Sequence, residues 1–549
     1  MSSSGFSDLK ALIVDDFDSF RLSVMRMLQE FGFAQVDSAI NGRDALRKCK
    51  ATDYDLVLCD YNLSQGKTGQ QVLEEVRLNR LLNESSLYVM ISAESSKQIV
   101  MAAYDYEPDA YLTKPITAKT LQQRLQRLIA QRQQMLPIYR ALDERDLPKA
   151  IEACRVFLSG NSRYRNHCQK LLGRLLLEQG DYIGAEGVYR EVLDVRELDW
   201  AQVGMAIARR GQDDWVGAEQ WAEQALKASP LCMKAYDLQV ALQRDRQDLH
   251  AQQEILQDAV ERSPLSIRRQ QMLGEVALVN RDIEVAVTAF RRAIKLGEYS
   301  CYDDPDTHLN FVRAASVAAI SGEEKNPAYH REVAKTLSDF ENRFGNSEIN
   351  KVAVQSVAAV FKSALGDAVG AEKQLSSARK IADDSALEMP LLIKLDWLDC
   401  YDNLNQQAEY KKLLDELQQY HQSDQSALEL LDRMLDAPTS QQNRRWLAEI
   451  NRHGIGCYEK RQFDEAINSF IKVSRKFPRH VGVRLNLLQA YTGKLKENGA
   501  ADLLEKAEQL SAEIERDITA GNESFERYRQ LRASLQEVAA DIKNGGQRG

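Results

Sequence analysis

A repeated spacing in the middle of the chain limits the folds that it can form. Ala225, Ala259 and Ala293 recur every 34 residues, and Pro230 and Pro264 keep the same interval. A fixed period of this length indicates one small unit that is repeated and buries its apolar face against its neighbours. Because the alternating pattern of strands is absent beyond Pro137, the sequence predicts an all-α stack of helical hairpins.

Other positions keep the same phase. Small residues recur where the two helices of a unit approach each other, with Gln252 as the exception: Ala150, Ala185, Ala218 and Ala286. Glycines, bulky residues and closing prolines recur as well: Gly173, Gly274 and Gly454; Tyr189, Leu256, Phe290 and Phe470; Pro230, Pro264 and Pro478. These residues resemble the tetratricopeptide-repeat family, which implies a solenoid whose concave face binds a protein or peptide.

The match is strongest over residues 133–297. Residues 298–440 are expected to be helical with degenerate repeats, of which Ala371, Leu375 and Ala378 form the best fragment. The phase returns over 441–515, and 516–549 are expected to form a C-terminal helix and a tail.

Residues 1–132 show a different pattern, in which short apolar runs alternate with longer amphipathic ones. This pattern is typical of βα units around a parallel sheet. Five strands are expected: Ala11–Val14, Gln35–Ser38, Leu56–Cys59, Tyr88–Ser92 and Ala110–Thr113. We predict a doubly wound, five-stranded parallel sheet with its site at the carboxyl ends of the strands, and a last helix that continues stiffly until Pro137 stops it.

Polar residues follow these strands. Asp15 and Asp16 follow the first, Asp60 the third and Lys114 the fifth, and Ser92 closes the fourth. Three clustered carboxylates raise one another's pKa unless a cation lies among them, and Mg²⁺ suits oxygen ligands. An ionised Asp60 can attack a phosphoryl group to form an aspartyl-phosphate, with Lys114 and Ser92 as partners of the phosphoryl oxygens.

Four segments together resemble the receiver domain of two-component response regulators, of the chemotaxis-regulator type: Leu12–Asp16, Leu56–Asp60, Met90–Glu94 and Tyr111–Pro115. The resemblance implies a flavodoxin-like fold and phosphorylation of Asp60 by a phosphohistidine on a sensor histidine kinase or a phosphotransfer protein. It also implies that Asp16, Asp60 and the backbone carbonyl of Asn62 hold Mg²⁺, with Asp15 acting through water.

The same resemblance implies roles for the residues around the acceptor. Lys114 and Ser92 would bind the phosphoryl oxygens, Tyr111 would be the aromatic switch, and Asn62 and Glu94 would tune the rate of dephosphorylation. The loop between Asp60 and Gly69 departs from the family, because it lacks the usual proline and carries an extra residue.

The chain is therefore predicted to be a response regulator with a protein-binding output, and no enzyme beyond its own phosphorylation and autodephosphorylation. Three alternatives stay open: a constitutive scaffold with a vestigial receiver, a transcriptional regulator acting through a protein partner, and a phosphatase of the haloacid-dehalogenase type. The phosphatase would need an aspartate at position 62, where Asn62 stands. The net charge of −9 disfavours direct binding of nucleic acid.

Composition adds expectations about the surroundings. The chain has no apolar run long enough for a signal peptide or a membrane span, so a cytoplasmic location without membrane contact is expected. Its eight cysteines form no C-x-x-C pair, which favours reduced thiols over a disulfide framework or a zinc site. Whether the chain forms a homodimer is left open.

Overall fold

The computed structural model describes residues 6–64, 66–93, 107–246, 248–321, 327–385, 387–477, 479–498, 501–518 and 524–545. The chain divides into two compact units. The first comprises Met1–Ala277 with Glu284–Phe311, and the second comprises Leu278–Ile283 with Val312–Gly549.

The first unit begins with a five-stranded sheet. Its strands are β1 (Lys10–Val14), β2 (Gln35–Ala39), β3 (Leu56–Asp60), β4 (Leu87–Ser92) and β5 (Ala110–Thr113). All neighbours are parallel, and the order is β2-β1-β3-β4-β5. This confirms the predicted doubly wound parallel sheet. Since β1 and β3 are neighbours, with Val14 beside Cys59, the residues that end these two strands lie next to each other.

Helices cover both faces of this sheet. One apolar core lies under α1 (Asp18–Phe31) and α5 (Ala118–Gln134), and it includes Leu28 and Leu125. The other lies under α2 (Gly42–Ala51) and α3 (Gly69–Leu78), and it includes Leu46 and Leu73. The central strands β3 and β4 are buried along their whole length, because a parallel sheet covered on both faces has no solvent-facing side.

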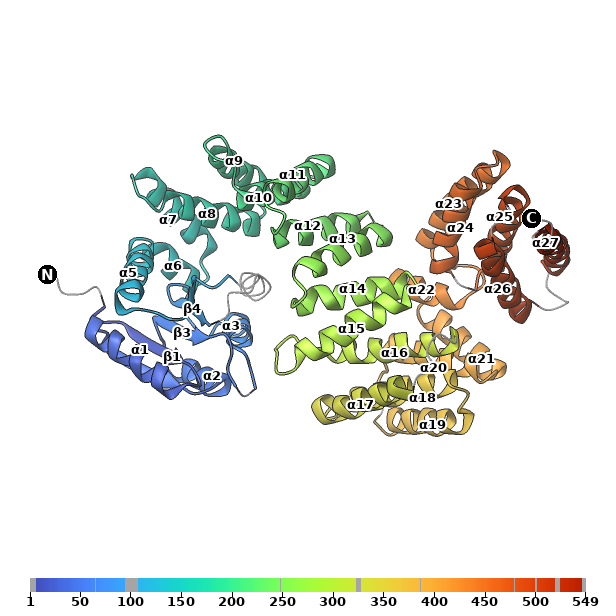
Figure 1. Cartoon of the computed structure of the whole chain (residues 1–549), viewed down its shortest axis with the longest axis horizontal. Coiled ribbons are helices and arrows are strands. Elements are labelled where there is room, and N and C mark those ends of the chain that lie inside the picture. The colour runs from blue at the N-terminus through green and yellow to red at the C-terminus, as the bar shows by residue number, and fades with distance from the viewer. Residues whose placement is uncertain are drawn as a thin grey trace. The chain divides into compact units, whose positions relative to one another are not determined.

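The rest of the first unit consists of helices (Figure 1), and as far as Arg262 each one packs against the next along the chain. They are α6 (Leu136–Asp143), α7 (Leu147–Ser159), α8 (Arg165–Gln179), α9 (Tyr182–Leu193), α10 (Asp199–Gly211), α11 (Trp215–Ala228), α12 (Met233–Asp245), α13 (Leu249–Arg262), α14 (Ile267–Val279) and α15 (Ile283–Gly297). Helix α10 contacts its neighbours in the chain, α9 and α11, and it also contacts α8 and α12. These three helices therefore form one layer, while α9 and α11 lie on its other side.

The predicted role of Pro137 was wrong. The last helix of the βα region, α5, ends at Gln134, and Pro137 lies in the first turn of α6. Proline is tolerated there because the first N–H groups of a helix have no partner within the helix. The connection between the two regions is therefore a break at Met135 followed by a new helix, and not one continuous helix.

The predicted alanine, glycine and bulky repeat positions are buried, and the glycine–aromatic pairs meet. Ala150, Ala185, Ala218 and Ala286 have no exposed surface. A Cβ atom added to Gly173 would lie 2.5 Å from the ring of Tyr189, and one added to Gly274 would lie 2.6 Å from that of Phe290. Small residues at these positions let the two helices approach. This arrangement is consistent with a repeat solenoid.

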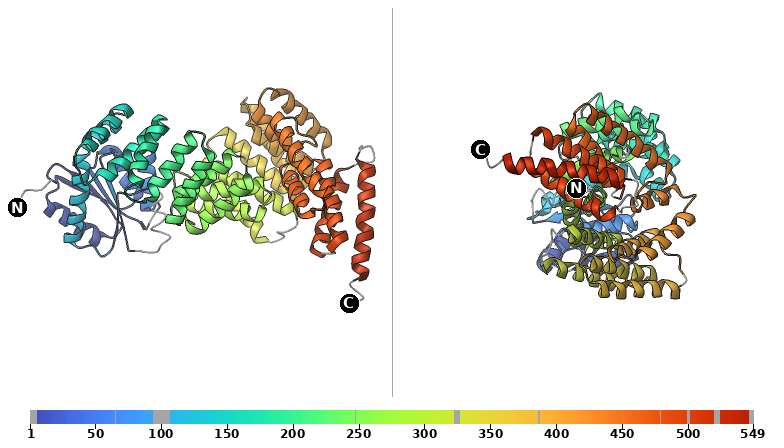
Figure 2. Two further views of the ribbon diagram at one scale, coloured as in Figure 1. Left: turned by 90° about the horizontal axis from the view of Figure 1, so that it is seen from above. Right: turned by 90° about the vertical axis from the view of Figure 1, so that its right-hand side faces the viewer.

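The second unit is also helical (Figure 1). The chain continues through α16 (Pro305–Ser321), α17 (Pro327–Phe344), α18 (Glu348–Ala364), α19 (Ala368–Ser385), α20 (Leu391–Asn403), α21 (Gln407–Tyr420), α22 (Gln425–Leu431), η1 (Asp432–Met434), α23 (Gln441–Glu459), α24 (Phe463–Lys476), α25 (Val481–Asn498), α26 (Ala501–Asp517) and α27 (Phe525–Gly545). Figure 2 shows α27 as a single straight helix at the C-terminal end.

The expected repeat fragments recur in this unit. Ala371, Leu375 and Ala378 are buried on α19, and a Cβ atom added to Gly454 would lie 2.7 Å from the ring of Phe470. Pro478 and residues 546–549 of the expected tail lie outside the described residues.

Two expectations from composition can be compared with this structure. None of the helices in the described ranges is both long and apolar enough to cross a membrane. All eight cysteines are free, and six of them are buried.

Candidate functional site

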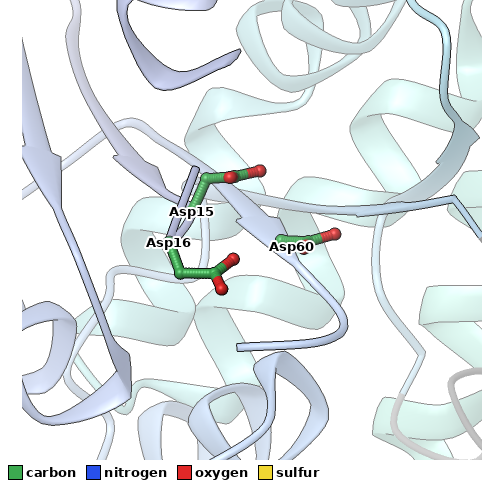
Figure 3. A group of neighbouring side chains, drawn as sticks. All are labelled: Asp15, Asp16 and Asp60. Carbon is green, nitrogen blue, oxygen red and sulfur yellow. The ribbon is translucent and has the colours of Figure 1, made fainter. Parts of the chain in front are cut away.

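Three aspartates meet at the carboxyl ends of the neighbouring strands β1 and β3 (Figure 3). Asp15 and Asp16 follow β1, and Asp60 is the last residue of β3. One carboxylate oxygen from each lies within 4.8 Å of the others. The predicted cluster is therefore brought together by the strand order, because β1 and β3 are adjacent and parallel.

Two of the three aspartates are shielded from water, and this burial determines how readily the Asp60 carboxyl ionises. Asp15 is 1 % exposed and Asp60 is 5 % exposed. Burial raises the pKa of the Asp60 carboxyl to about 6, opposed by the Lys114 ammonium and reinforced by the neighbouring charges of Asp15 and Asp16. The site thus holds more negative charge than its one lysine compensates.

Lys114 bridges two of the aspartates. Its Nζ lies 2.8 Å from Oδ2 of Asp15 and 3.2 Å from Oδ1 of Asp60, and it also stands 4.2 Å from the centre of the Phe20 ring. The backbone N–H of Lys114 donates a 2.8 Å hydrogen bond to the carbonyl of Ser92. The β4–β5 pairing therefore holds the lysine over the acidic pocket.

Asp16 differs from its neighbours. Its Oδ1 atom is buried and, within the part of the chain that the structure describes, it accepts no hydrogen bond. A buried carboxylate oxygen without a partner is costly, and a cation removes that cost. The oxygen-only donor set of three carboxylates suits a hard divalent ion such as Mg²⁺, so these residues fit the metal that the sequence predicts.

The backbone around Asp60 is tightly packed. The N–H of Gly69 donates to the carbonyl of Tyr61 at 2.9 Å, and the Tyr88 hydroxyl donates to the carbonyl of Gly69 at 2.9 Å. A Cβ atom at position 69 would collide with the carbonyl oxygen of Asp60. Glycine is therefore required at the start of α3 because this helix begins directly against the end of β3.

The other predicted residues lie around the pocket. Ser92 is fully buried at the end of β4, the strand next to Asp60. Tyr111 is half-buried on β5 and packs against the core under α2 and α3. Asn62 is exposed in the loop after β3, and Glu94 lies outside the described ranges.

Sequence reasoning missed three contacts that shape this pocket. The N–H of Phe17 donates to Oδ1 of Asp15 at 2.8 Å, and the Arg21 guanidinium donates to the carbonyl of Asp15 at 2.7 Å. The Phe20 ring under Lys114 is the third. All three come from the N-cap and the first turn of α1. The signal available in the sequence was that these residues come directly after the two aspartates.

Comparison with known proteins agrees with this geometry. Residues 11–126 match the model of the response regulator receiver domain. The N-terminal part of this chain therefore belongs to the CheY-like response regulator receiver domains.

The individual relatives that match are about as long as this N-terminal region and much shorter than the whole chain. The chain is 33% identical over 121 residues to the chemotaxis protein CheY-3 of Vibrio cholerae, a match that covers 22% of this chain and 92% of the relative. It is 29% identical over 120 residues to the chemotaxis protein CheY of Pseudomonas aeruginosa, covering 22% and 95%. Among solved structures, Vibrio cholerae CheY4 is 30% identical and covers 22% of this chain and 98% of its own, with a TM-score of 0.21.

Proposed function

We propose that this chain is a two-component response regulator, in which Asp60 accepts a phosphoryl group from a phosphohistidine on a sensor histidine kinase or a phosphotransfer protein. The observation that carries the proposal is the pocket itself. Asp60 is buried beside two further carboxylates, one of which has an unsatisfied oxygen, and Lys114 lies within 3.2 Å of the acceptor carboxylate.

The chemistry requires little from the protein besides position and charge. A carboxylate oxygen of Asp60 forms a bond to phosphorus while the bond from phosphorus to the donor's imidazole nitrogen breaks, and the electron pair stays on the imidazole, which takes up a proton. Asp16, Asp60 and the carbonyl of Asn62 would hold Mg²⁺, with Asp15 acting through water. The bound ion would offset the negative charge of the incoming phosphoryl group.

Lys114 and Ser92 would serve the product. The ammonium of Lys114 already contacts Asp60, and both it and the Ser92 hydroxyl would bind phosphoryl oxygens. Tyr111 would be the switch residue that responds to Ser92, and Asn62 and Glu94 would set the lifetime of the phosphoryl group. In this proposal the chain catalyses nothing beyond its own phosphorylation and dephosphorylation.

We further propose that the helices after the receiver are tetratricopeptide repeats that bind a protein or peptide. Three glycine–aromatic contacts at equivalent positions support this, together with an aspartate that caps the second helix of successive hairpins. Asp146, Asp181, Asp214 and Asp248 each accept a hydrogen bond from the backbone N–H three residues later.

The proposal is tested by covalent labelling. Purified protein is incubated with acetyl phosphate and Mg²⁺, and the phosphorylated residue is found by mass spectrometry beside Asp60→Asn and Asp16→Asn. We expect labelling of the wild-type chain at Asp60, loss of labelling in Asp60→Asn, and a strong reduction in Asp16→Asn or in excess EDTA. Absence of any Mg²⁺-dependent labelling would contradict the proposal and favour a constitutive scaffold with a vestigial receiver.

A further inference from the structure

Helix α3 of the receiver contacts a segment far along the chain. This segment, residues 296–302, comprises the end of α15 and most of the link to α16, and both α3 and the segment belong to the first unit. Nε2 of Gln71 lies 3.0 Å from the carbonyl oxygen of Glu298 and 3.3 Å from that of Leu296. Lys67 donates to the carbonyl of Tyr299. The segment therefore binds polar side chains of α3 and of the loop before it through its own backbone carbonyls.

The centre of this contact is a buried carboxyl group. The Ser300 hydroxyl donates a 2.9 Å hydrogen bond to Oε2 of Glu74. Glu74 is 1 % exposed and Ser300 is 8 % exposed. The free energy of a buried carboxylate depends strongly on its hydrogen-bond donors. Undocking the segment removes one donor, so it costs more free energy here than the loss of an exposed hydrogen bond would.

Buried hydrogen bonds connect this contact to the residue after the phosphoacceptor. Nε2 of Gln70 donates to Oε1 of Glu74 at 3.1 Å, and the hydroxyl of Tyr61 donates to Oε1 of Gln70 at 3.2 Å. Tyr61 directly follows Asp60. The path from Asp60 to Ser300 is thus continuous through Tyr61, Gln70 and Glu74, and it runs beneath the first two turns of α3.

The backbone provides a second, stiffer connection. Gly69, the first residue of α3, packs so closely on Asp60 that a Cβ atom would overlap the Asp60 carbonyl oxygen. A change in the backbone at Asp60 is therefore passed to the start of α3, since there is no free space between them to absorb it. Both connections lead to the start of α3.

A separate contact holds the receiver to the helices at another point. Glu107 lies 3.3 Å from Nζ of Lys170 on α8 and 2.6 Å from Nζ of Lys234 on α12. Both helices belong to the layer that α8, α10 and α12 form together. The receiver therefore contacts the helices that follow it at more than one point.

We propose that segment 296–302 is the intramolecular binding partner of the receiver's α3 face, and that phosphorylation of Asp60 weakens this contact through Tyr61, Gln70 and Glu74. This inference rests on the proposed function, because it assigns a readout to the same phosphorylation site. The direction follows from the packing. The phosphoryl group must enter a pocket in which Asp60 is only 5 % exposed, so the backbone after β3 has to move and the tightly packed start of α3 moves with it.

Thermodynamic linkage allows the coupling to be measured either at the contact or at Asp60. If occupation of Asp60 weakens the contact, then breaking the contact must strengthen occupation of Asp60 by the same factor. Ser300→Ala removes the hydroxyl donor and leaves the phosphorylation pocket unchanged. Ser159→Ala is the matched control, because Ser159 is exposed at the end of α7 and its hydroxyl donates to the carbonyl of Val156 within its own helix.

The experiment uses the full chain, beryllofluoride with Mg²⁺ as the phosphoryl analogue, and hydrogen exchange followed by mass spectrometry. Without the analogue, we expect Ser300→Ala to speed exchange in residues 296–302, and Ser159→Ala to leave it unchanged. With saturating analogue, the wild-type segment should exchange about as fast as in Ser300→Ala. The variant should bind the analogue about fivefold more tightly than the wild-type chain, the factor that one typical hydrogen bond corresponds to.

The outcomes separate the two proposals. A wild-type chain that binds no beryllofluoride refutes the proposed function, and the coupling falls with it. A chain that binds the analogue with unchanged exchange in residues 296–302, or with equal affinity in Ser300→Ala, refutes the coupling alone. Glu74→Gln provides a second variant, which keeps the planar shape of the side chain but replaces the carboxyl group by an amide, and the same tighter binding is expected.

Discussion

Replacing Asp60 by asparagine should stabilise the metal-free receiver at neutral pH. The pKa of Asp60 is about 6 in the fold, against an ordinary value of 3.8, because burial and the neighbouring aspartates disfavour its charge. Each unit of pKa corresponds to about 1.4 kcal/mol, so ionising Asp60 in the folded state costs at most about 3 kcal/mol of unfolding free energy. The asparagine side chain removes this cost without changing the volume of the pocket.

The sign of the pH dependence is the specific part of this prediction. Below pH 3.8 the group is protonated in both states and contributes nothing. Between 3.8 and about 6 the unfolded chain loses its proton while the folded chain keeps it, so the contribution of Asp60 falls as pH rises. The advantage of Asp60→Asn should therefore be absent near pH 4, grow through pH 6 and stay constant above pH 7.

The measurement is hydrogen exchange of the peptides that contain β1 and β3, in excess EDTA, between pH 4 and 8 and corrected for intrinsic exchange rates. All five tryptophans lie outside the receiver, at positions 200, 215, 221, 397 and 446, so tryptophan fluorescence would report on the wrong region. Asp53→Asn is the control, because Asp53 is exposed just before β3. Equal stability of Asp60→Asn and wild type at pH 7.5, or an advantage that grows toward acid, would refute the reasoning.

Three further predictions test other parts of the structure. Gly173→Ala should destabilise the first unit by about 1–3 kcal/mol, because the added Cβ would meet an aromatic ring. Gly187→Ala should stabilise the unit by about 0.5–1 kcal/mol, because position 187 faces open space, so thermal unfolding of both variants distinguishes packing from helix propensity. Glu107→Gln should speed hydrogen exchange in α12 at low salt and have no effect in 0.5 M salt, since its ion pair with Lys234 is about half exposed; an effect independent of salt would contradict an ionic contact. Mg²⁺ at about ten times its dissociation constant should raise receiver stability by about 1.4 kcal/mol in the wild-type chain, and hydrogen exchange of β1 should show a clearly smaller gain in Asp16→Asn.

Much of the acidic site was predictable because it depends on strand ends alone. Asp15, Asp16 and Asp60 were assigned to the carboxyl ends of two strands, and a doubly wound parallel sheet places those ends together. The helical hairpins were predictable for a similar reason. A glycine and an aromatic residue that recur in phase, such as Gly173 and Tyr189, describe a contact within one unit.

The predicted end of α5 was wrong because proline has two opposite tendencies. It disfavours a helical conformation of the residue before it, and yet it is accepted in the first turn of a helix. The pattern around Pro137 fits a helix end as well as a helix start, and only the observed backbone distinguishes them. The raised pKa of Asp60 has its largest cause in burial, which no spacing of residues reports.

The sequence by itself determined the strands, the helical repeat and the chemistry available at the strand ends, since these follow from local periodicity and from contacts between neighbouring elements. Only the tertiary structure decided that Ser300 lies against Glu74, across 226 positions of sequence, and that Glu107 lies between Lys170 and Lys234. Those contacts depend on how successive helices pack on one another, and a pattern that repeats along the sequence does not encode where the helices meet the receiver.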